Sequence, residues 1–143
     1  MSDVLAAFLF AQLDVWPFIQ VKRQTLWTRY HNELRDWCSA NGVRQPVIPP
    51  HCEQAYHMYY LLLPSLDVRT RLIAHLKAQG ILAVFHYLPL HLSEYARQWG
   101  GKEGDCPVTE DVSDRLLRLP FFNSMSQDVQ GRVIGAIQDF RVG

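Results

Sequence analysis

The apolar run VLAAFLFAQL at residues 4–13 is the feature that most constrains how this 143-residue chain can fold. Ser2 or Asp3 can cap a helix over about 4–15, and apolar side chains would face nearly every side of that helix. Its large apolar residues are Val4, Leu5, Phe8, Leu9, Phe10 and Leu13. A helix of this kind is normally buried all round, so these residues are predicted to form an interface.

The same run predicts neither a secretory signal nor a membrane span. No lysine or arginine precedes it, Asp14 closes it, and a span needs about 20 apolar residues. Lys+Arg and Asp+Glu both number 14, so no basic field suggests a nucleic-acid partner. Three widely spaced cysteines predict reduced thiols in a cytoplasmic protein rather than a disulfide framework or a zinc site.

Hydrophobic periodicity predicts a single α+β domain over residues 1–143, with an α+β core over about 44–143. Helices are expected over about 4–15, 17–41, 67–80, 108–119 and from Ser126 onward, and strands over 55–63, 81–87 and 118–122. Asp67 and Thr109 are the expected caps of two of these helices. The nearly continuous apolar start of 81–87 predicts a strand that is covered on both faces.

The segment VFHYLPLH at 84–91 carries most of the candidate chemistry. His86 and His91 are five residues apart, which does not place two ligands on one helix face, and no third ligand has motif spacing, so no metal site is expected. The segment is either a strand end whose polar tips face water or one wall of a pocket for a polar ligand. His57 is expected to be a core histidine with a satisfied partner.

The series AAFLFAQL, RQTLWTRYHNEL, AYHMYYLLL, RTRLIAHLKAQGILAVFHYLPLH, RLLRLPFFNSMS and VIGAIQDF resembles the C-terminal part of the DegT/StrS family. That family consists of pyridoxal-phosphate-dependent nucleotide-sugar aminotransferases. The resemblance covers residues 3–141 and implies a small antiparallel sheet of about three strands packed with helices. It also implies that His86, Tyr87 and His91, with His57, face the sugar nucleotide.

The resemblance further implies that the cofactor and its Schiff-base lysine belong to a separate large domain. Only Lys22, Lys77 and Lys102 occur here, and none lies in the family's Ser/Thr-rich lysine segment. Schiff-base chemistry needs a desolvated lysine held at the cofactor. We therefore expect no catalytic residue, no bound cofactor and no activity from this chain alone.

Three functions remain open on the sequence. The chain is a detached aminotransferase domain or half of a split enzyme, which docks onto a large-domain partner chain. Alternatively, it is a stand-alone sugar-nucleotide-binding module, or an interaction domain that reuses the fold. Whichever holds, the apolar helix at 4–15 predicts self-association, with a two-fold homodimer as the simplest form.

Overall fold

A three-stranded antiparallel sheet with the order β1-β3-β2 lies at the centre of the computed structural model, which describes residues 2–142. The strands are β1 (Tyr60–Leu62), β2 (Val84–Phe85) and β3 (Leu116–Arg118). Arg118 lies opposite Tyr60 on one side and Val84 on the other, while Leu117 lies opposite Leu61 and Phe85. The α+β class and the small antiparallel sheet predicted from the sequence are confirmed.

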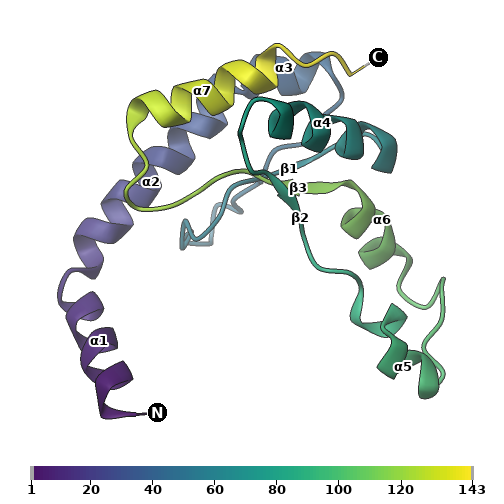
Figure 1. Cartoon of the computed structure of the whole chain (residues 1–143), viewed down its shortest axis with the longest axis horizontal. Helices are drawn as coiled ribbons and strands as arrows, with labels where there is room; N and C mark the ends of the chain where they lie inside the picture. Colours follow the sequence, from purple (N-terminus) through teal and green to yellow (C-terminus); the bar gives the residue numbers. More distant parts are fainter. Residues whose placement is uncertain (1, 143) are drawn as a thin grey trace.

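One face of this sheet is covered by helices and the other is open. Leu61 and Leu117 are fully buried in the core, together with residues of α2 (Trp16–Glu33), α4 (Leu66–Ala78) and α7 (Gln127–Gln138). Figure 1 shows these helices on one side of the strands. Because side chains alternate along a strand, Tyr60, Arg118 and Val84 share the opposite face. The open face is therefore where the sheet can meet a ligand or a partner.

The helix expected over 17–41 divides at Leu34 into α2 and α3 (Arg35–Ala40). The backbone carbonyl of Glu33 accepts a hydrogen bond from the side-chain amide of Gln138, at 2.9 Å. This bond ties the break to the last helix, α7. Ser126 caps α7 as predicted, and its Oγ accepts from the backbone N–H of Val129.

The strand expected over 55–63 is confined to β1. Tyr56 has a φ of 49°, which interrupts the extended backbone, and His57 is exposed rather than buried in the core. The strand expected over 81–87 is likewise only β2, and the prediction that both its faces are covered is wrong. Val84 is 36% exposed and Phe85 is 44% exposed because β2 is an edge strand.

The region after β2 contains η1 (Leu90–Leu92), α5 (Glu94–Gln98) and α6 (Pro107–Arg115). The cap of α6 is Cys106 rather than the expected Thr109. The helix begins at Pro107 because proline is well suited to the first helical position. It also ends early, so β3 occupies 116–118 instead of the expected 118–122. In α4, the cap is Ser65 rather than Asp67.

Helix α1 (Asp3–Asp14) extends away from the rest of the molecule (Figure 1) and contains no buried residue. Val4 is 79% exposed and Phe8 is 67% exposed. Among the described residues, no single helix is long and apolar enough to cross a membrane. Helices α1 and α2 reach the length and apolar composition of a membrane span only when they are taken together, and the pair is bent by 65°. The apolar surface of α1 thus has no cover from the other residues that the structure describes.

Candidate functional site

His86, Tyr87 and Arg118 form a cluster at the open face of the sheet. His86 and Tyr87 directly follow β2, and their ring centroids lie 4.9 Å apart in an edge-to-face arrangement. The guanidinium carbon of Arg118, from the central strand, lies 5.6 Å from the centre of the Tyr87 ring. Strand alternation accounts for this cluster, since His86 is two residues beyond Val84, the cross-strand partner of Arg118.

The positive charge of the cluster belongs to the Arg118 guanidinium. Burial lowers the pKa of His86, and the neighbouring charges of Arg118 and His57 lower it further. No acidic side chain pairs with His86 or Arg118 among the described residues. The Nδ1 atom of His86 and the Nε atom of Arg118 are both buried without a hydrogen-bond partner. An anion at this face would therefore meet a favourable field.

A cavity of about 280 Å³ adjoins the cluster. It is lined by His86, Tyr87, Val108, Thr109, Val112, Ser113 and Leu116. The Ser113 hydroxyl donates a hydrogen bond to the backbone carbonyl of Tyr87, at 3.0 Å, and so fixes the chain after β2 against α6. A second cavity of about 750 Å³ shares three of these lining residues and also includes Tyr60 and Leu62. The two hollows thus adjoin along the open face.

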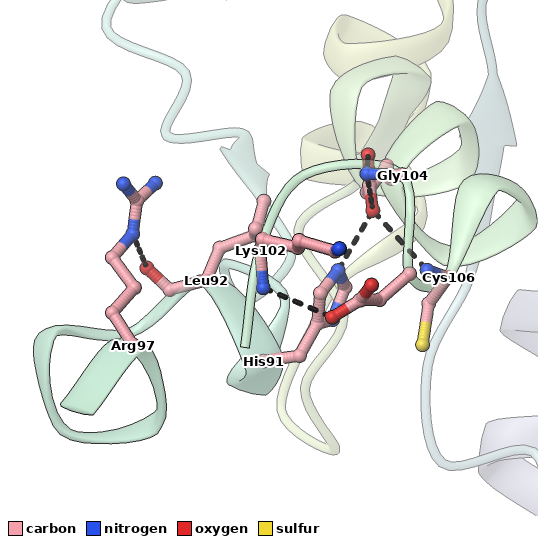
Figure 2. Close-up of polar contacts among 8 residues, drawn as sticks. His91, Leu92, Arg97, Lys102, Gly104 and Cys106 are labelled. Atoms are coloured by element: carbon pink, nitrogen blue, oxygen red, sulfur yellow. Dashed lines mark hydrogen bonds and ion pairs between the residues drawn. The ribbon is translucent and has the colours of Figure 1, made fainter. Parts of the chain in front are cut away.

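His91 is held away from this cluster by Glu110. Its Nε2 lies 2.8 Å from Glu110 Oε1, and the same carboxylate accepts backbone N–H bonds from Gly104 and Cys106 (Figure 2). The hydrogen bond from His91, followed by that from Gly104, lowers the pKa of Glu110. This arrangement ties the loop before α6 to η1, and it occupies the Nε2 atom of His91.

The chain offers no suitable lysine for a Schiff base. Lys22, Lys77 and Lys102 are all exposed, whereas such a lysine must be desolvated and held at the cofactor ring. The residues present therefore do not fit the covalent attachment of pyridoxal phosphate. The described residues also contain no group of three His, Cys, Asp or Glu side chains placed to hold a metal ion.

The structure brings two of the four substrate-facing candidates, His86 and Tyr87, into direct contact. His86 and Tyr87 are adjacent, and His57 is near enough to affect the charge of His86, but His91 belongs to the Glu110 cluster. The prediction that His57 is a core residue is wrong. The carbonyls of Tyr56 and His57 both accept from the Arg23 guanidinium, which holds this segment at the surface.

Arg118 and Glu110 were missed by reasoning from the sequence. Arg118 lay in a predicted strand and Glu110 in a predicted helix, and neither belongs to a motif. Arg118 reaches the site through its cross-strand register with β2. Glu110 acts through its contact with His91, which lies 19 positions earlier in the chain. The one signal for Arg118 in the sequence is a charge inside the apolar run LLRLPFF at 116–122.

The chain is similar to part of several known aminotransferases. The model of the DegT/DnrJ/EryC1/StrS aminotransferase family matches residues 1–138. The spore coat polysaccharide biosynthesis protein SpsC of Bacillus subtilis is 30% identical over 100% of this chain and 37% of its own length. The dTDP-3-amino-3,4,6-trideoxy-α-D-glucose transaminase of Micromonospora megalomicea is 27% identical over 100% of this chain and 38% of its own length.

A solved structure shares the fold. The DegT/DnrJ/EryC1/StrS aminotransferase from Brucella abortus superposes with a TM-score of 0.77 and 30% identity, covering 93% of this chain and 34% of that one. The chain thus spans little more than a third of the length of these relatives and matches their C-terminal region. On its sequence and its fold, the chain belongs to the DegT/DnrJ/EryC1/StrS aminotransferase family.

Proposed function

We propose that this chain supplies one wall of a sugar-nucleotide aminotransferase site and that the Schiff-base lysine is carried by a separate domain. The observation that carries this proposal is the combination of an open sheet face bearing His86, Tyr87 and Arg118 with three lysines that are all exposed. The chain then binds and orients the substrate but performs no chemistry alone. The name of the M. megalomicea relative supports a dTDP-linked sugar as the substrate class.

The shape of the molecule supports docking onto a larger domain. Helix α1 and the segment around α5 extend from the body on either side of the sheet region (Figure 1). Both carry exposed apolar residues: α1 through Phe8 and its neighbours, and the second segment through Tyr87, Leu88, Leu90, Tyr95 and Trp99. Large exposed apolar surfaces mark interfaces. We assign both surfaces, together with the open sheet face, to contact with the lysine-bearing domain.

Self-association through α1 is a second proposal for the chain when it has no such partner. The six large apolar residues of α1 are between 44% and 79% exposed. Each gains roughly 1.5–3 kcal/mol when it is fully buried. A second copy of the chain offers the same apolar surface, so a two-fold contact between α1 helices would bury both.

The docking proposal can be tested with the lysine-bearing remainder of the B. abortus relative. Mixed with this chain, or fused to it, that remainder should reduce hydrogen exchange in α1 and in residues 87–99. A fused protein whose remainder binds pyridoxal phosphate, but whose α1 exchanges as fast as in the free chain, would contradict the proposal. Fusion removes weak affinity as an explanation for a negative result.

A further inference from the structure

The open face of the sheet carries a guanidinium group that nothing in the described chain neutralises. Arg118 lies on the central strand between Tyr60 and Val84, and its side chain makes no ion pair and no hydrogen bond among the described residues. Its one side-chain contact of note is with the face of the Tyr87 ring. Three other arginines form ion pairs: Arg29 with Glu33, Arg71 with Asp67 and Arg115 with Asp111.

The neighbours of Arg118 do not compensate for its positive charge. His86 packs edge-on against Tyr87 at the end of the adjacent strand, and its lowered pKa favours the neutral imidazole. Arg118 Nε and His86 Nδ1 are both buried without a hydrogen-bond partner. Buried polar groups in folded proteins normally have partners, and these two flank the same Tyr87 ring.

We infer that Arg118, with His86 beside it, forms an oxyanion subsite on the open sheet face. The planar guanidinium suits two oxygens of one phosphate or carboxylate group, and Tyr87 restricts its orientation by stacking. The inference rests on the proposed function, because it names the part of the substrate that this wall would hold. The two sources of such an oxyanion are the diphosphate of a nucleotide sugar and the carboxylate of an amino donor.

The test is a titration of the complete chain, observed through the imidazole NMR signals of His86 at constant pH. The probes are inorganic phosphate, dTDP and glutamate, each in a separate titration. Saturable shifts with phosphate and dTDP would support the subsite and assign it to the diphosphate. Saturable shifts with glutamate alone would support the subsite and assign it to a carboxylate.

Variants of matched charge identify the residue responsible. Arg118→Met should weaken binding by about tenfold or more, the effect of removing a hydrogen bond to a charged group. Arg35→Met removes an exposed arginine from α3, in the helical layer, and should bind as the original chain does. Arg118→Lys should restore part of the affinity, which also guards against a folding defect in Arg118→Met.

Three results would overturn the inference: no saturable shift with any probe, equal affinity in Arg118→Met, or equal loss in Arg35→Met. Failure of this inference can be distinguished from failure of the proposed function. If docking to the lysine-bearing domain succeeds while the subsite titration fails, only the assignment to Arg118 and His86 is wrong. If the subsite binds an oxyanion while docking fails, the chain is a binding module without that partner.

Discussion

The imidazole of His91 and the carboxylate of Glu110 meet at 2.8 Å and join η1 to the first turns of α6. Glu110 Oε1 and Oε2 also accept from the N–H of Gly104, both at 3.0 Å (Figure 2). A single carboxylate thereby organises a loop that is otherwise polar and rich in glycine. Glu110 therefore contacts this loop at two of its backbone amides, those of Gly104 and Cys106.

Replacement of Glu110 by Gln should release that loop. An amide oxygen is a weaker acceptor than a carboxylate and cannot form a charge-assisted bond with His91. We expect faster hydrogen exchange at the Gly104 and Cys106 amides, with exchange in the core helices unchanged. Glu103→Gln changes an exposed carboxylate in the same loop and serves as the control. Equal exchange rates at these amides in the two variants would contradict the role of Glu110 in holding the loop.

Acid should open the same loop. The hydrogen bond from His91, then that from Gly104, holds the pKa of Glu110 below its ordinary value of 4.5. Its contribution to stability is therefore complete above pH 4.5 and is lost as the pH falls through the lower, folded-state pKa. Exchange at the Gly104 amide, corrected for intrinsic rates, should rise across that acid range in the original chain and stay flat in Glu110→Gln. A rise of equal size in both proteins would assign the transition to another group.

Arg23 should be required for the exposed conformation of residues 56–57. Its Nε donates to the carbonyl of Tyr56 at 2.7 Å, another nitrogen donates to the carbonyl of His57, and Nη1 donates to Asn123 Oδ1 at 2.9 Å. Arg23→Met should lower the free energy of unfolding by about 2 kcal/mol, since hydrogen bonds to charged groups are among the stronger ones. Lys22→Met alters the exposed neighbour and should leave urea unfolding unchanged.

Several features of the fold are predictable because local rules decide them. Leu72 and Leu76 recur at helical spacing and are both fully buried in α4. Gly42 has a φ of 63° and lies directly after α3, as a helix-stop glycine should. Helical period depends on neighbours in the sequence, so a pattern of residues is sufficient to predict it, whereas the caps of α4 and α6 both lie before the expected residues.

The candidate site is less predictable because distant residues decide it. The position of Arg118 beside Tyr87 depends on the register of β3 against β2, and neither strand exceeds three residues. The exposure of His57 depends on Arg23, 34 positions earlier in the chain. An aromatic-rich run at 55–63 favours a strand on propensity alone, but the contacts of Arg23 with its carbonyls override that preference.

The apolar surface of α1 should make the free chain associate. Light scattering over a range of protein concentration is expected to give a mass above that of one chain. The double change Leu5→Ser and Phe8→Ser should shift the mass toward the monomer, with the unfolding free energy altered by no more than about 0.5 kcal/mol because neither side chain is buried. Ala7→Ser is the control. A strictly monomeric original chain at high concentration would rule out this interface.

The most direct test of the central claim is borohydride trapping of the chain with pyridoxal phosphate, followed by peptide mass analysis. If the chain has no Schiff-base lysine, labelling should be slow and partial, and it should be spread over the three exposed lysines, Lys22, Lys77 and Lys102. The aminotransferase from B. abortus, treated in the same way, is expected to be labelled at one residue. Rapid, stoichiometric labelling of one lysine in this chain would contradict the account.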